Sequence, residues 1–469
     1  MIRTVLFLIL SISLAGCASL RPYSAPPVAP AAIVNADPTL VSGQPLDLRW
    51  WGQFDDPVLS ALIDQALEAN RDVKVAIARV DQARAGFDQA EAERMPRVPV
   101  SASVDRREQA IPGFTDERRG TSTYRLGFDA YWEVDLFGRL RSAVQAAAAT
   151  AESFEANLDD VRVSVASEVA RNYFELRGLQ QQLAVAERSL VNQQESLRLT
   201  RVRRDAGIGE EQDVASAAAG VSAIEAVLPP LRSALAQRAH RLAVLNGERP
   251  GQLRADLSPR AYPPLGKAIA IGEAGSVLTR RPDVRAAERR LAAATGREGI
   301  AAADLYPRVT VTGFIGFIAG RGSLFGNADS RAWAVTPALA WAGFDFGNAR
   351  ARLRGAAAAT RESAAEYEQA VLLAIEEVEN ALVAYREQQK RLVSLVEQAR
   401  ESTRAAGIAR VRYREGMADF LSLLDAERTQ LRAEDGVAQA EAGVFTSMIA
   451  VYKSLGGVPL REPVAAELK

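Results

Sequence analysis

Apolar and polar residues alternate along two pairs of segments, one pair in each half of the chain. Val98, Val100 and Val104 alternate with polar or small neighbours, and the next segment of that pair continues the period of two. Such alternation, with aromatic residues near the ends, is typical of transmembrane β-strands, although a hairpin in a soluble periplasmic domain would show it too. We predict strands at about 97–106, 124–136, 308–318 and 331–345, with a polar loop at about 107–120.

Two much longer segments, at about 139–205 and 348–415, follow a different period and contain no proline. Apolar residues recur in them at alternating steps of four and three, which predicts helices that pack as coiled coils. At ~1.5 Å per residue, each helix is on the order of 100 Å long. The pattern is carried by Val371, Ile375, Val378, Leu382, Tyr385, Gln389, Leu392, Val396 and Ala399, and in the first segment by Val169, Tyr173, Leu176, Gln180, Leu183 and Leu190.

Shorter helices are expected beside these long ones. Gly207 and Gly416 stand where a glycine commonly ends a helix, so a return helix should follow each of them. Asp56 can cap a helix ahead of the first strand pair, and Pro57 suits its first turn. The predicted shorter helices lie at about 57–94, 210–245 and 418–455.

The chain is a tandem duplication of one structural unit. Pro96 and Pro307 lie 211 positions apart in similar surroundings, and Gly138 and Gly347 lie 209 apart. Two repeats supply only four strands, and an open strand edge is not tolerated in lipid, so a barrel requires several copies of the chain. The predicted organisation is a first repeat at 50–249, a proline-rich linker or equatorial region at 250–281, a second repeat at 282–457 and a tail at 458–469.

The first residues predict export and lipid attachment. Residues 1–16 carry one positive charge at Arg3 and an apolar core too short to span a bilayer, as in a signal peptide. The core ends at Leu-Ala-Gly-Cys17, which resembles the bacterial lipobox, whereas an ordinary secretory peptide followed by a chance cysteine is the alternative. Ala18, where an Asp would favour inner-membrane retention, points to the outer membrane.

The next segment, 17–49, is rich in proline and predicts an extended, lipidated tether. Beyond the signal peptide we expect no apolar run long enough for a transmembrane helix. If the protein crosses a membrane, it is therefore expected to do so with strands.

Charge and composition exclude several classes of function. The formal net charge is −1, which argues against nucleic acid as the main partner. The chain has one Cys and one His, so we expect no disulfide, no metal site and no cofactor other than an N-terminal lipid on Cys17. His240 has no matching nucleophile motif, so no enzyme activity is expected. The basic runs 201–204 and 410–414 are either solvated helix faces or pair with acidic residues across helices.

Five segments together resemble the TolC-superfamily outer-membrane efflux factors of the NodT type, the outer-membrane lipoproteins of RND efflux systems. They lie at 50–57, 281–288, 301–308, 413–425 and 451–457. The resemblance implies an α+β membrane protein that forms a homotrimer. Its parts would be a long α-helical coiled-coil barrel and a transmembrane β-barrel with four strands per chain and twelve per trimer.

The same resemblance implies a function in the cell outer membrane. The trimer would be the channel of a tripartite efflux pump, conducting drugs or other small toxic compounds passively from the periplasm to the exterior. A periplasmic adaptor (membrane fusion protein) and an inner-membrane RND-type transporter are the implied partners. A periplasmic coiled-coil scaffold lipoprotein without a pore is the alternative, and a lipid-anchored enzyme is a weaker one.

The family's functional positions map onto the region after the two helix-ending glycines. Leu421 and Asp425 match residues that narrow the pore, and Asp213 and Tyr413 match a clasp that holds the closed state. The turns at Gly207 and Gly416 match the tips that dock the adaptor. Two positions depart from some members, since Ala418 replaces a locking Arg and Ser422 replaces a second acidic residue, so the closing network is expected to be built differently here.

We predict that Cys17 is the lipid-bearing first residue of the mature protein, because it is the only cysteine and stands at the lipobox position. Intact-mass spectrometry of protein from membranes should show a diacylglyceryl-modified chain that begins at Cys17. Cys17→Ser should remove that mass. An unmodified Cys17, or a mature chain that begins elsewhere, would contradict the prediction.

Overall fold

The computed structural model describes residues 23–26, 33–47, 49–111, 115–264, 268–272, 278–341, 343, 345 and 347–457. The predicted signal peptide, Cys17 and the predicted tail lie outside the described residues. The chain forms two compact units, of which the first comprises Met1–Pro27, Arg79–Glu155 and Ala286–Glu368, and the second Val28–Ala78, Ala156–Arg285 and Gln369–Lys469. Each unit draws on both sequence repeats, so the duplication does not correspond to two separate bodies.

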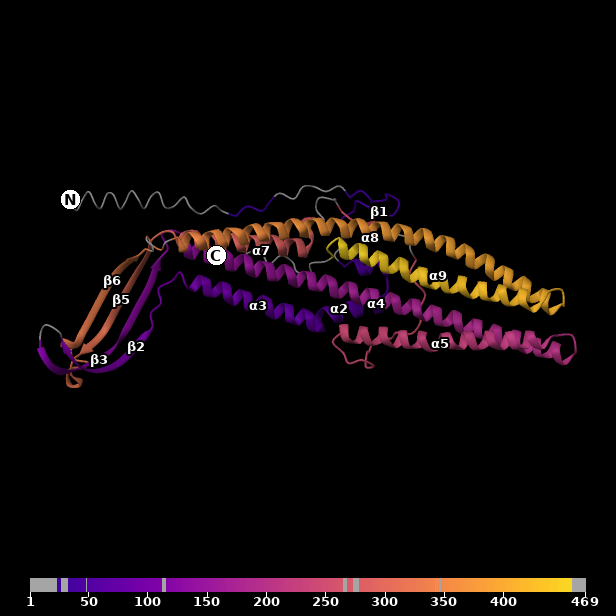
Figure 1. Ribbon diagram of the computed structural model, residues 1–469, viewed down its shortest axis with the longest axis horizontal. Coiled ribbons are helices and arrows are strands. Elements are labelled where there is room, and N and C mark those ends of the chain that lie inside the picture. The colour runs from indigo at the N-terminus through magenta and orange to yellow at the C-terminus, as the bar shows by residue number, and fades with distance from the viewer. Residues whose placement is uncertain are drawn as a thin grey trace. The chain divides into compact units, whose positions relative to one another are not determined.

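The first unit contains a four-stranded antiparallel sheet in the order β2-β3-β5-β6 (Figure 1). The four strands were predicted, but the predicted loop at about 107–120 is wrong. The pairing continues through Arg107↔Thr121 and Glu108↔Gly120, because the backbone ladder forms whatever the charge of the side chains. The strands are β2 (Val100–Ile111), β3 (Thr115–Val134), β5 (Arg308–Ala319) and β6 (Arg331–Ala340), with short 3-10 helices η3 (Gly322–Leu324) and η4 (Ala328–Ser330) between the last two.

The register places most of the large apolar residues of the four strands on one face, with Phe314 and Ile318 on the other. Val100 pairs with Phe128, Phe128 with Ile315, and Ile315 with Trp333. These four side chains are 65%, 52%, 64% and 78% exposed. Residues of the opposite parity, among them Asp129, form a mainly polar or small-residue face. The sheet therefore has one continuous apolar face that nothing in this chain covers among the described residues.

Two helices of 67 residues follow the strand pairs, α4 (Arg139–Asp205) and α8 (Asn348–Arg414). Two return helices of 35 residues follow them, α5 (Glu211–Leu245) and α9 (Phe420–Ser454). The long helices and their returns were predicted. The single helix predicted at about 57–94 is wrong, because it is divided at Asn70 into α2 (Pro57–Ala69) and α3 (Arg71–Ala92). The remaining elements are β1 (Val41–Ser42), η2 (Trp50–Phe54), β4 (Ile269–Ala270) and α7 (Pro282–Ala303).

One helix is more apolar than the sequence analysis expected. By length and composition, α5 could cross a membrane. Part of its apolar surface is instead buried within the second unit, at Val214, Ala217, Val221 and Ile224. The core helix of a soluble protein passes the same test, so this composition does not by itself make α5 a membrane span.

The aromatic residues of the motif at 50–57 pack in the core of the second unit, so the motif has a structural role. Trp50 stacks on Tyr452 with ring centroids 5.2 Å apart, and both rings are buried in the second unit. Phe54 packs edge-on against Phe174 at 4.9 Å. The predicted helix cap is confirmed, since Asp56 accepts hydrogen bonds from the backbone N–H groups of the first turn of α2 at 2.9 and 3.1 Å.

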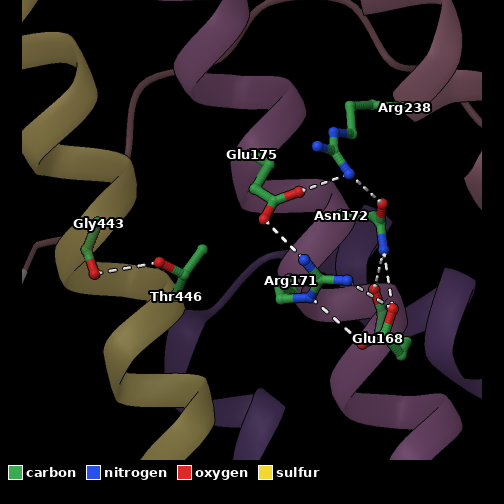
Figure 2. Close-up of polar contacts among 7 residues, drawn as sticks. All are labelled: Glu168, Arg171, Asn172, Glu175, Arg238, Gly443 and Thr446. Carbon is green, nitrogen blue, oxygen red and sulfur yellow. Dashed lines mark hydrogen bonds and ion pairs between the residues drawn. The ribbon is translucent and has the colours of Figure 1, made fainter. Parts of the chain in front are cut away.

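A polar network fastens α5 to α4 within the second unit (Figure 2). Arg238 of α5 donates to the Asn172 Oδ1 atom at 3.2 Å and pairs with Glu175 at 2.9 Å. Arg171 of α4 bridges Glu168 and Glu175 at 2.8 and 3.0 Å. Because Asn172 is fully buried and these charges are paired, the network fixes the register of the return helix against the long one.

The last residue of each return helix accepts a hydrogen bond from one side chain, and the two donor side chains lie at equivalent positions of the duplication. The Asn70 Nδ2 atom donates to the carbonyl of Leu245 at 2.9 Å. Arg281, 211 positions later, donates to the carbonyl of Ser454 at 2.7 Å. Arg281 is 5% exposed and also binds carboxylates of Asp283 and Glu377. We call these two contacts the repeat joints.

We predict that Arg281→Met lowers the free energy of unfolding by about 2 kcal/mol, because it leaves the Ser454 carbonyl and the Asp283 carboxylate without their donor. The midpoint of thermal unfolding, followed by circular dichroism, should fall by several degrees. Arg290→Met, on the exposed side of α7, the helix that begins directly after Arg281, is the matched control and should leave the midpoint nearly unchanged. Equal midpoints for the two variants would contradict the importance of this joint.

Candidate functional site at the helix turns

The two turns between long and return helices are built in the same way. Gly207 has φ +73° and Gly416 has φ +76°, a left-handed conformation that favours glycine. The N–H of Ile208 donates to the Arg203 carbonyl at 3.0 Å, and the N–H of Met417 donates to the Arg412 carbonyl at 2.8 Å. These bonds complete the helix ends in the Schellman pattern, so the glycines end the helices as predicted.

The start of α9 determines which side chains project outward. Asp419 caps the helix by accepting from the Ser422 N–H at 2.6 Å. Phe420 is buried in a cluster with Tyr413, Ala217, Leu423 and Leu424. The neighbouring Leu421 is 57% exposed.

The two predicted constriction residues share this exposed side of α9. Leu421 and Asp425 are both exposed and are four positions apart, so they lie one turn apart on one helix face. The face opposite them is held by the buried cluster around Phe420. An apolar and an acidic side chain are thus displayed together next to the turn.

The predicted clasp residues are near each other but are not joined by a hydrogen bond among the described residues. Burial raises the pKa of Tyr413, while the positive charge of Arg203 opposes that shift and the negative charge of Asp213 adds to it. Burial also raises the pKa of Asp213, with Glu210 adding to the shift and Arg203 opposing it. Arg203 thus acts on both predicted clasp residues.

Arg203 makes the direct link that the sequence analysis missed. Its Nη1 atom donates to the carbonyl of Tyr413 at 2.8 Å, and its guanidinium lies 4.9 Å from the centre of the Tyr413 ring. Both contacts join α4 to α8 beside the turns. The sequence pattern that could have indicated this link is the basic run at 201–204. In the same run, Arg204 pairs with Asp205 and Glu211. Two of its arginines therefore form contacts across or along helices.

A second link crosses three helices at Glu427 of α9, whose side chain is 8% exposed. It pairs with Arg410 of α8 at 3.0 Å and accepts from Ser196 Oγ of α4 at 3.1 Å. Burial raises the pKa of Glu427, while Arg410 and Ser196 oppose that shift. Sequence alone did not identify Glu427, because it resembles the many solvated carboxylates of a long helix.

Within the described residues, no group of three or more His, Cys, Asp and Glu side chains could hold a metal ion. His240 is exposed on α5. What the turn region offers is a set of contacts between helices, an exposed apolar side chain and an exposed carboxylate.

Most of the chain matches one known protein family. The family model described as "Outer membrane efflux protein" matches residues 62–248 and 274–457, which is most of the chain. The chain belongs to the outer membrane efflux protein family. Nodulation protein T of Rhizobium leguminosarum bv. trifolii is 30% identical over 441 residues, covering 92% of each chain. The pyoverdine export outer membrane protein OpmQ of Pseudomonas putida is 31% identical over 464 residues, covering 97% of each.

Solved structures of efflux family channels agree with this assignment. The outer-membrane channel OprN is 48% identical with a TM-score of 0.91, covering 93% of this chain and 98% of that one. The open state of the MtrE outer membrane channel of Neisseria gonorrhoeae is 29% identical with a TM-score of 0.84, covering 94% and 98%. The resemblance to the TolC superfamily and its NodT branch is thereby confirmed. The family and its neighbours are efflux channels and not enzymes.

Proposed function

We propose that this protein is the outer-membrane channel of a tripartite efflux pump and conducts drugs or other small toxic compounds passively from the periplasm to the exterior. It would do so when docked to a periplasmic adaptor and an inner-membrane RND-type transporter, and Cys17 would carry the lipid that anchors it. The relatives include an antibiotic efflux pump outer membrane protein, ArpC of Pseudomonas putida, at 29% identity. A scaffold without a pore is disfavoured by the observation below.

The continuous apolar face of the four-stranded sheet carries the proposal. Phe128, Ile315 and Trp333 are exposed in one row across the sheet. Soluble proteins rarely expose a contiguous apolar patch of this kind, which argues against a soluble periplasmic hairpin. Lipid covers such a face at no cost in desolvation, while the polar face can line water. A sheet with these two faces is suited to the wall of a water-filled duct.

The same sheet motivates a homotrimer. Its outer strands, β2 and β6, each have one edge that no described residue of this chain pairs. In lipid, unpaired N–H and C=O groups cost several kcal/mol each. Pairing β2 of one copy with β6 of the next removes both edges, and three copies of four strands give a closed barrel of twelve.

We expect native mass spectrometry of the detergent-solubilised protein to show a trimer. Replacing Val104 of β2 by Pro should reduce trimer yield, because it removes an N–H donor from the free edge of the sheet. The hydrogen-bonded pair Arg97↔Tyr131 sets the alternation by which the N–H of Val104 points away from β3. Val104→Ile is the matched control. A stable wild-type monomer with intact β-signal in circular dichroism would contradict the trimer.

The proposed gate lies at the turns after Gly207 and Gly416, which are also the proposed adaptor-docking tips. Three-fold symmetry would bring three copies of Leu421 and Asp425 into rings, and converging carboxylates favour cations at a constriction. Asp213 and Tyr413 would hold this arrangement closed, and Arg203 supports it through the Tyr413 carbonyl. Ala418 and Ser422 leave no locking Arg or second acidic ring at their positions.

We predict that Asp425→Ala weakens cation selectivity in single-channel recordings, because it removes the acidic ring. Asp213→Ala combined with Tyr413→Phe should raise the open probability, because it removes the proposed clasp. Each hydrogen bond that the clasp would make in the closed trimer is worth about 0.5–1.5 kcal/mol and would act in three copies. Arg203→Gln should act in the same direction, whereas Arg201→Gln, on the exposed side of α4, is its control. If all these variants conduct like wild type, the gate lies elsewhere.

A further inference from the structure

A cavity of about 360 Å³ lies in the second unit between the helices that follow the turns. Its walls come from α4, α5, α8 and α9, and its volume is within the range of pockets that hold small molecules. The residues that matter below are Gln193, Gly220, Ile224, Leu431, Arg428 and Arg432. Neither the pore constriction nor the clasp includes any of them.

One wall of the cavity holds a buried amide donor without a partner. Gln193 is 4% exposed, and its Nε2 atom has no hydrogen-bond partner among the described residues. Gly220 makes room for this amide, because a Cβ there would lie 2.9 Å from the Nε2 atom. A buried N–H without an acceptor is unfavourable, and an acceptor in the cavity would relieve that cost.

The charges around the cavity favour an anion. The Glu427 carboxylate is already engaged by Arg410 and Ser196, so that pair is close to neutral. Arg428 and Arg432 also line the cavity, one turn apart on α9, and neither forms an ion pair with a described residue. Two guanidinium groups without carboxylate partners leave a net positive wall, and guanidinium binds carboxylate and sulfonate oxygens through paired N–H donors.

The remaining walls are apolar. Ile224 is buried on α5, Val227 is half exposed beside it, and Leu431 faces the cavity from α9. A fully hydrated inorganic anion would gain nothing from these side chains. An anion with a compact apolar body would cover these side chains and remove apolar surface from water, which favours binding.

We propose that this cavity binds a small amphipathic organic anion, a carboxylate or sulfonate with an aromatic or short aliphatic body. Arg428 and Arg432 hold the acidic group, the Gln193 amide donates to an acceptor, and Ile224 and Leu431 pack on the apolar body. The ligand contacts α4, α5 and α9 together, so it stabilises the arrangement of these helices seen here. The site goes beyond the proposed channel role, and its occupancy does not depend on conduction.

The test is isothermal titration calorimetry on the full-length protein in nonionic detergent, with 4-phenylbutyrate as the probe. The uncharged 4-phenylbutyramide has the same body and serves as the matched ligand control. We expect saturable binding of one 4-phenylbutyrate per chain, at least about tenfold tighter than the amide because charge-assisted hydrogen bonds are lost in the latter. No saturable binding, or equal affinity for the two compounds, would overturn the proposal.

Two variants localise the binding. Arg428→Gln with Arg432→Gln should weaken 4-phenylbutyrate binding at least about tenfold, and Gly220→Ala should weaken it by crowding the Gln193 amide. Arg350→Gln with Arg354→Gln makes the same charge change at the same spacing on α8, away from the cavity, and should bind like wild type. Circular dichroism verifies folding of each variant. If the folded cavity variants bind like this control, the cavity is not the site, whatever the channel recordings show.

Discussion

The rest of this protein depends on how the backbone hydrogen bonds of one sheet are completed. Four strands pair with each other in sequence, and most of their large apolar side chains fall on a single face. That face is suited to lipid, yet lipid offers no partner to the free edges of β2 and β6. One copy of the chain could not close such a sheet in lipid by itself, and the proposed trimer follows from this shortage of strands more directly than from any side-chain contact.

The two helix pairs, α4 with α5 and α8 with α9, are joined near their turns by a different set of contacts. Beside the turns, the buried apolar cluster around Phe420 is accompanied by a few polar contacts. Arg203 reaches a carbonyl on α8, and Glu427 joins α4, α8 and α9 through Arg410 and Ser196. Buried ion pairs add little net stability because desolvation offsets their attraction, but breaking one partner is costly. Such contacts therefore favour one alignment of the helices mainly by penalising arrangements that leave a partner unpaired.

Periodicity predicted most of the fold, because a strand or helix with one buried or lipid-facing side repeats its apolar residues at a fixed interval. It failed where local chemistry and tertiary contacts decide. Charged residues at 107–111 and 115–120 suggested a loop, yet they extend a hairpin whose ladder is made by the backbone. Asn70 breaks a predicted continuous helix because its amide caps α3 and binds the Leu245 carbonyl. Arg203 and Glu427 matter because of partners on other helices, which one sequence without relatives cannot reveal.

The two repeat joints show what a gene duplication retains. Both copies still place a donor at the same position, and both donors reach the last turn of the returning helix. One donor is a neutral amide and the other a guanidinium with two carboxylate neighbours. The copies have thus diverged in charge and side-chain length while the point of attachment stayed the same. In this architecture the duplication has conserved the location of a contact more strictly than the chemical group that makes it.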